Sequence, residues 1–191
     1  MRSIQTLALS SAFALVALLG ACASSAPPPF NPPAPVTSWI VNGEGAPIGR
    51  AMVREGPGGV LVRLAFDEGA LPAGWHGVHV HAIGDCSDAA SGFHVSGVHE
   101  GFGDETAHGL ANPAGPEDGD FPNLYAPASG AFGAEFYNER LTLTRDDNGR
   151  GRLLDADGSA LVIHAGPDDQ ESQPIGGAGA RLACAAFRPM P

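Results

Sequence analysis

The sequence contains no lysine, and all 10 of its basic residues are arginine. Its 21 acidic residues bring the formal net charge to −11. A nucleic-acid partner needs a basic face, so this charge balance argues against DNA or RNA as a partner. An enzyme with this charge could act on an anion only if positive potential were focused locally at its site.

Long apolar runs are equally scarce. The run from Leu7 to Leu19 follows Arg2, is too short to span a membrane, and has the form of the apolar region of a secretory signal peptide. It ends in Leu19-Gly20-Ala21-Cys22, which resembles a bacterial lipobox. We therefore expect residues 1–21 to be a signal peptide and Cys22 to carry the lipid. An ordinary signal peptide cleaved nearby is the alternative.

A lipidated Cys22 predicts an exported protein, anchored through its lipid to an envelope membrane on the periplasmic side of a bacterial cell. No acidic residue follows Cys22 at position 23 or 24, which in a Gram-negative cell favours the outer membrane. Residues 22–36 are rich in proline and cannot build a core, so they read as an extended linker. Residues 37–191 are enough for one domain with one core.

The chain has only three cysteines. With Cys22 assigned to the lipid, Cys86 and Cys184 remain, and an exported compartment permits a disulfide between them. Two unpaired buried thiols are the alternative.

No long segment shows helical periodicity, and short apolar segments alternate with turn signals from 27 glycines and 17 prolines. This pattern favours an all-β sandwich or barrel. We expect strands at residues 38–41, 51–54, 60–66, 78–83, 123–125, 131–137, 141–143 and 161–164. Residues 84–122 form a long loop rich in glycine, aspartate and histidine, and a loop of this length in a compact domain usually has a function.

A histidine pair lies in one of the expected strands. His79 and His81 are separated by a single residue, so in a strand they point to the same side and can share one metal ion. Copper favours convergent imidazole ligands of this kind.

Several blocks of the sequence occur in the order seen in one known family. The blocks His76-Gly77-Val78-His79-Val80-His81, Leu161-Val162-Ile163-His164-Ala165-Gly166 and Gly179-Ala180-Arg181-Leu182-Ala183-Cys184 resemble motifs of the copper,zinc superoxide dismutases. His108-Gly109, Gly115-Pro116 and Gly119-Asp120 fall at the spacings of that family's zinc loop. The resemblance covers roughly residues 37 to 188. It implies a Greek-key β-barrel with long metal-binding loops and a Cys86–Cys184 disulfide. It also implies an oxidoreductase that converts superoxide to oxygen and hydrogen peroxide.

The resemblance implies four copper ligands, namely His79, His81, His99 and His164. The ligand that bridges copper and zinc is ambiguous, because Ser91-Gly92-Phe93-His94 and Ser96-Gly97-Val98-His99 both resemble the family's approach to it. We choose His99, whose spacing to His108 needs the smaller insertion. His94 would then be an exposed loop residue.

The resemblance implies a zinc site formed by His99, His108, Glu117 and Asp120. The family has a third histidine where this chain has Glu117, so the site is altered and its zinc occupancy is open. Zinc accepts carboxylate oxygen, so binding is not excluded. Asp118 is an alternative to Glu117.

Four further roles follow from the resemblance. Arg181 is expected to attract superoxide beside the copper, and His99 to take part in catalysis as the bridging ligand. Asp168 is expected to accept hydrogen bonds from ligand histidines of both metals, and His76 to brace the barrel. A non-catalytic copper-binding lipoprotein on the same scaffold is the competing hypothesis, because the zinc loop is altered. Nothing in the sequence determines the oligomeric state.

Overall fold

The computed structural model describes residues 30–103, 106–145 and 149–189. The expected signal peptide, Cys22 and most of the expected linker lie outside these residues. Within the described part of the chain, no helix is both long and apolar enough to cross a membrane.

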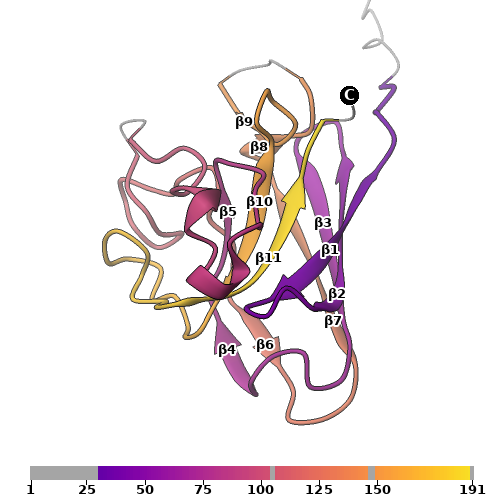
Figure 1. Cartoon of the computed structure of the whole chain (residues 1–191). Coiled ribbons are helices and arrows are strands. Elements are labelled where there is room, and N and C mark those ends of the chain that lie inside the picture. Colours follow the sequence, from indigo (N-terminus) through magenta and orange to yellow (C-terminus); the bar gives the residue numbers. More distant parts are fainter. Residues whose placement is uncertain (1–29, 104–105, 146–148, 190–191) are drawn as a thin grey trace, which may run out of the picture.

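The described residues form strands joined by loops, with two single-turn 3-10 helices in the longest loop (Figure 1). The strands are β1 (Val36–Asn42), β2 (Pro47–Glu55), β3 (Val60–Phe66), β4 (Gly74–His76), β5 (Val78–His81), β6 (Leu124–Ala126), β7 (Phe132–Asn138), β8 (Leu141–Thr142), β9 (Gly151–Arg152), β10 (Ser159–His164) and β11 (Arg181–Phe187). The short helices are η1 (Ala89–Ser91) and η2 (His94–Ser96).

Seven strands form one curled antiparallel sheet in the order β5-β10-β11-β1-β2-β3-β7. Strands β4 and β6 form a separate two-stranded ladder, and Figure 1 shows them below the curled sheet. The curl brings β2 and β3 over β5, β10 and β11, so that the inner faces enclose the core. The predicted all-β fold is confirmed.

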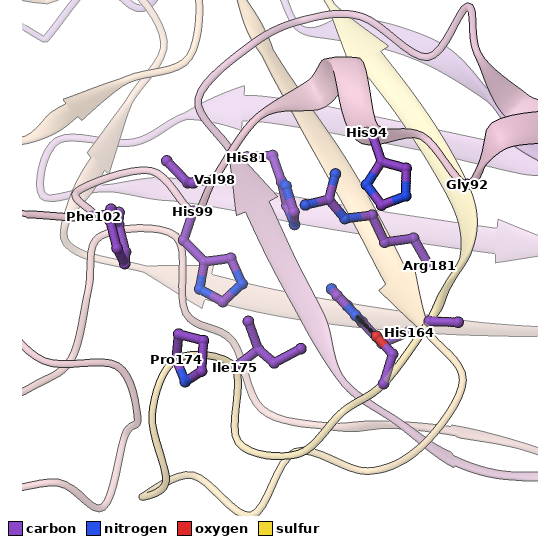
Figure 2. Close-up of a pocket in the computed structure, with 12 residues that line it drawn as sticks. His81, Gly92, His94, Val98, His99, Phe102, His164, Pro174, Ile175 and Arg181 are labelled. Atoms are coloured by element: carbon purple, nitrogen blue, oxygen red, sulfur yellow. Dashed lines mark hydrogen bonds between the residues drawn. The ribbon is translucent and has the colours of Figure 1, made fainter.

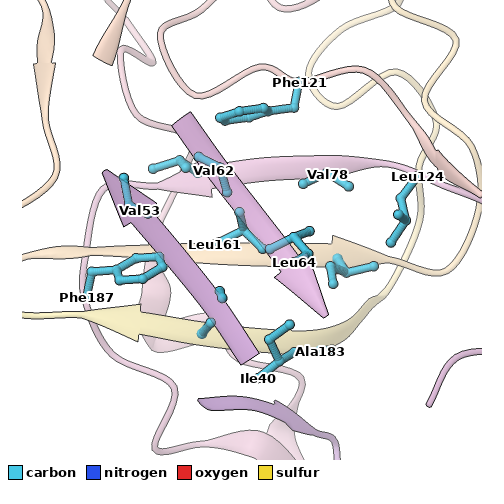
Figure 3. Close-up of a cluster of buried hydrophobic side chains, with 14 of the residues drawn as sticks. Ile40, Val53, Val62, Leu64, Val78, Phe121, Leu124, Leu161, Ala183 and Phe187 are labelled. Atoms are coloured by element: carbon cyan, nitrogen blue, oxygen red, sulfur yellow. The ribbon is translucent and has the colours of Figure 1, made fainter. Parts of the chain in front are cut away.

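The core is built from the alternation of side chains along the strands. In β3, Val60, Val62, Leu64 and Phe66 are buried, while the residues between them are half-buried or exposed. Strand β10 is buried along its whole length, and its Leu161 packs inside the curl opposite β2 and β3 (Figure 3). Each such apolar side chain contributes about 1.5–3 kcal/mol by leaving water. This core holds β5 and β10 rigidly side by side.

A disulfide joins Cys86, which follows β5, to Cys184 in β11. It closes a loop with a sequence separation of 98, for which loop entropy gives about 4–5 kcal/mol of stabilisation. Beside it, the fully buried Phe93 packs in a small apolar cluster with Ala160 and Val162 of β10. These contacts fix the loop that carries η1 and η2 against β10 and β11.

Candidate metal centre

Two neighbouring strands and one returning loop place the histidines. Strand β5 pairs with β10, with His79 opposite Val162 and His81 opposite Ala160, and β10 ends at His164. The long loop then returns along β5, where His99 forms an isolated bridge with His81. Residues distant in sequence thus meet at one edge of the sheet.

Four buried histidines form the first cluster, which we call the four-histidine group. One ring nitrogen from each of them lies within 4.8 Å of the other three. The group consists of His79, His81, His99 and His164.

Each member of the four-histidine group has one buried ring nitrogen without a hydrogen-bond partner. These atoms are Nδ1 of His79 and Nε2 of His81, His99 and His164. Buried polar atoms normally have partners, so four unpaired nitrogens that converge on one point need an explanation. A metal ion provides it, and an all-imidazole set suits copper.

The second nitrogen of each ring is held by the protein. His81 Nδ1 lies 3.0 Å from the carbonyl oxygen of Gly97, and His164 Nδ1 lies 3.0 Å from that of Gly179. A carbonyl oxygen can only accept, so these nitrogens carry the proton and donate it. The Nε2 lone pairs are therefore free to bind a metal ion.

Burial keeps three of these imidazoles neutral. Desolvation lowers the pKa of His79 and, well below its ordinary value, that of His81. Desolvation, followed by the proximity of His79, lowers the pKa of His164 to about 3. A neutral imidazole is the form that ligates a metal, so the site is prepared for binding at neutral pH.

A second cluster combines imidazoles with carboxylates, and we call its members His99, His108, Glu117 and Asp120 the mixed group. One ligand atom from each of His79, His99, His108 and Asp120 also lies within 4.8 Å of the other three. The unpaired Nδ1 of His79, however, belongs to the four-histidine group. Glu117 is buried, and its Oε2 lies 2.8 Å from His99 Nδ1 and 3.7 Å from His108 Nδ1.

Asp120 completes the mixed group, with its Oδ1 2.7 Å from His108 Nδ1 and 3.6 Å from His99 Nδ1. Two ligand atoms in a tetrahedral zinc site lie about 3.4 Å apart. The four distances scatter around this value, and a set of two nitrogens and two oxygens suits zinc, so the residues fit that ion.

Charge is concentrated in the mixed group. Burial alone would lower the pKa of His108, but hydrogen bonds to Asp120, Asp168 and Glu117 raise it to about 11. Burial opposes ionisation of Asp120 and Glu117 too, yet their contacts with the two histidines hold both carboxyl pKa values below their usual range. The pKa of His99 is raised, since hydrogen bonds to Asp120 and Glu117 outweigh its burial.

Asp168 connects the two groups. Its Oδ2 accepts a hydrogen bond from His79 Nε2 at 2.8 Å, and its Oδ1 lies 3.1 Å from His108 Nε2. Burial opposes ionisation, but the bonds to His108 and His79 hold the carboxyl pKa well below its usual range. Such a partner orients both rings at once.

Three residues that the sequence did not bring to attention support this arrangement. Asn123 exchanges hydrogen bonds with the backbone of Asp168, donating to its oxygen at 2.7 Å and accepting from its nitrogen at 2.8 Å. Gln173 binds the backbone N–H and carbonyl of His108 in the same way, at 3.1 and 2.9 Å. Gly176 leaves space for the Asp168 carboxylate. The contacts of Asn123 and Gln173 span tens of residues, and no local pattern signals them.

A cavity of about 430 Å³ opens onto the four-histidine group, and Arg181 lies in its wall (Figure 2). Arg181 donates to the carbonyl oxygens of Phe93 at 2.7 Å and Gly97 at 2.8 Å and to Ser96 Oγ at 3.2 Å. Burial lowers the pKa of Arg181, but a guanidinium remains charged in proteins. The protein therefore holds a fixed cation beside the histidine cluster.

The remaining predicted residues are also located. His99 belongs to both groups, whereas His94 is exposed at the cavity mouth (Figure 2). His76 is buried, with its ring nitrogens 2.7 Å from the His164 carbonyl and 2.8 Å from the Pro72 carbonyl. Asp118 accepts a hydrogen bond from the backbone of Gly151.

The chain matches the family model described as copper/zinc superoxide dismutase over residues 48–187. It is 44% identical over 152 residues to the superoxide dismutase [Cu-Zn] of Caulobacter vibrioides, covering 80% of this chain and 84% of that protein. It is 37% identical over 149 residues to superoxide dismutase [Cu-Zn] 2 of Aquifex aeolicus, covering 78% and 84%.

Solved structures show the same similarity. A double mutant of a SOD-like protein from Bacillus subtilis superposes with a TM-score of 0.72 at 30% identity, covering 80% of this chain and 97% of that one. The Cu/Zn superoxide dismutase from Brucella abortus gives a TM-score of 0.58 at 26% identity, covering 80% and 99%.

Proposed function

Since this chain belongs to the copper/zinc superoxide dismutase family, we propose that its four-histidine group binds copper, that its mixed group binds zinc, and that Arg181 captures superoxide between solvent and copper. The chain is an oxidoreductase that acts on superoxide and uses copper and zinc. Two superoxide ions and two protons give one oxygen and one hydrogen peroxide. Copper, when bound, supplies the one-electron redox chemistry.

The observation that carries the proposal is the set of four unpaired, buried ring nitrogens. The protein holds the opposite nitrogens of His81 and His164 on backbone carbonyls and that of His79 on Asp168. The ligand lone pairs are thus oriented before any ion arrives, which reduces the reorganisation that binding requires.

Arg181 orients the substrate. Its guanidinium lines the cavity that contains His81, His99 and His164. It offers superoxide a positive charge and a charge-assisted hydrogen bond. Three contacts with the Phe93–Gly97 turn keep it there, so little side-chain entropy is lost when the anion binds.

His99 occupies a position between the groups. Its Nε2 faces the four-histidine group, and its Nδ1 lies 2.8 Å from Glu117 Oε2 in the mixed group. When Nε2 is not ligating a metal ion it can hold a proton, and we assign to it the delivery of that proton to the reduced substrate. Asp120 and Glu117 fix the orientation of this ring from the other side.

A pair of histidine variants tests these roles. Copper-loaded His99→Ala should show altered nitrogen hyperfine structure in electron paramagnetic resonance and weaker zinc binding, because one ligand of each ion is lost. His94→Ala is the matched control, since it removes a histidine from the same loop, and it should keep both metals. If His94→Ala altered both metal sites and His99→Ala left them intact, the bridging role would belong to His94.

The anchoring of the protein is a further part of the proposal. Cys22, in the lipobox-like Leu19-Gly20-Ala21-Cys22, is proposed to carry lipid and to hold the domain, through linker residues 22–36, at the periplasmic face of an envelope membrane. Stable attachment needs more than one acyl chain, as a bacterial lipoprotein carries. Membrane fractionation of wild type and Cys22→Ser tests it. If wild type and Cys22→Ser gave equal amounts of soluble periplasmic protein, lipidation of Cys22 would be refuted.

A further inference from the structure

One of the seven histidines has no part in either metal group or in bracing the barrel. This residue, His94, is exposed, and its side chain lines the same cavity as Arg181 and three members of the four-histidine group. In the view of Figure 2, the His94 ring and the Arg181 side chain are drawn toward one side of the cavity and His99 toward the other. A polar side chain in the wall of a substrate cavity can contact the substrate as it enters.

The backbone holds His94 in a defined place relative to Arg181. Phe93 and Gly97, on either side of η2, accept hydrogen bonds from the Arg181 guanidinium at 2.7 and 2.8 Å. Phe93 is fully buried and adopts a left-handed conformation with φ of 57°, which a bulky residue takes only when its surroundings enforce it. The turn is therefore wrapped around the guanidinium, and the backbone of His94 is held in place relative to Arg181.

The charge around the mouth makes an additional anion-binding group valuable. The chain carries a net charge of −11 and no lysine. Among the described residues that line the cavity, Arg181 is the only one with a permanent charge, and none is acidic. The acidic group that interacts electrostatically with Arg181 is Asp88, whose Oδ2 lies 3.3 Å from the backbone nitrogen of Val95.

We propose, building on the function proposed above, that His94 and Arg181 together form an outer binding site for small anions at the cavity mouth, where superoxide is captured before it reaches the four-histidine group. Arg181 contributes a permanent positive charge. His94 contributes a ring N–H donor, so that an anion bound by Arg181 can also accept a hydrogen bond from the imidazole.

Chloride binding tests the site without turnover. Chloride NMR line broadening is measured on copper- and zinc-loaded protein for wild type, His94→Ala, which removes the donor, His94→Gln, which keeps a polar donor, and His94→Lys, which adds a permanent charge. Val95→Ala is the matched control, because Val95 is exposed on the same turn but does not line the cavity. Thermal melting of each loaded variant verifies the fold.

His94→Ala should bind chloride more weakly than wild type, because the donor is lost, and His94→Gln should bind it more tightly than His94→Ala. His94→Lys should raise chloride affinity about threefold over wild type, the effect of one charge ~6 Å from the anion in water, and Val95→Ala should follow wild type. Chloride affinity that His94→Ala leaves unchanged, or that His94→Lys does not raise, would overturn the proposal. Superoxide removal is measured in parallel, so that an inactive wild type refutes the dismutase function while chloride binding still decides the anion site.

Discussion

Gly176 stands where a side chain would collide with the Asp168 carboxylate. A Cβ built on Gly176 would lie 1.7 Å from Asp168 Oδ1 and 3.0 Å from His108 Nε2. Atoms cannot approach so closely, so the glycine is required for the carboxylate to reach the mixed group.

Gly176→Ala should therefore displace Asp168 and weaken zinc binding. Gly177→Ala is a matched control, because both glycines have positive φ, of 57° and 66°, but a Cβ at Gly177 meets nothing within 4 Å. Backbone strain should cost both variants about 1 kcal/mol. The collision should cost Gly176→Ala about 1–3 kcal/mol more. Denaturant unfolding and zinc titration measure the difference, and equal losses in the two variants would contradict it.

Asp168→Asn should weaken metal binding in both groups. The carboxylate contacts His79 and His108, and loss of such a partner typically costs 10- to 100-fold in affinity. The neighbouring Asp169→Asn is the control, since Asp169 is exposed and bonds to Ser172. Competition with a chelator gives both affinities. If Asp168→Asn bound zinc as tightly as wild type, the contacts of the carboxylate with His79 and His108 would be dispensable.

Glu117→His should raise zinc affinity. Glu117 already lies 2.8 Å from His99 Nδ1, so an imidazole there would give a site of three histidines and one aspartate with less negative charge. Wild type should lose its second ion to a mild chelator before its copper. Asp118→His is the comparison, because Asp118 bonds to the Gly151 backbone. If Asp118→His raised zinc affinity and Glu117→His did not, Asp118 rather than Glu117 would occupy the third zinc position.

Arg181→Glu should lower catalytic efficiency by about 10- to 100-fold without removing copper, because electrostatic steering acts on the substrate. Arg63→Glu is the control, with the same change in net charge on the exposed face of β3, where Arg63 pairs with Glu135. Wild-type activity should fall as ionic strength rises. Loss of copper from Arg181→Glu, or equal activity in the two variants, would argue against this role.

The sequence predicted the fold and named the residues that converge in the metal centre, but it did not predict the hydrogen bonds that hold those residues in place. The period of a strand is enough to bring His79 and His81 to one side, and β3 lies at the expected residues 60–66. The expected strand at 78–83 ends at His81. The expected strands also omit β4, β9 and β11. Strands β4 and β9, at three and two residues, are too short to show a periodicity.

The support for the site depends on contacts between distant segments. Asn123 reaches Asp168 across 45 residues, and Gln173 reaches His108 across 65. Spacing alone also left two candidates for the bridging histidine. In the structure His99 lies with the other three histidines, whereas the buried Phe93 anchors one end of the turn and His94 lines the cavity mouth.

The central claim is that copper in the four-histidine group, with Arg181 beside it, makes this chain a catalyst. Pulse radiolysis of the copper- and zinc-loaded protein tests it most directly, by following superoxide decay at a protein concentration far below that of superoxide. We predict a decay rate proportional to bound copper over many turnovers, and its loss in a His164→Ala variant that no longer holds the ion. Consumption of only one superoxide per bound copper would contradict the account and identify a copper-binding protein without dismutase activity.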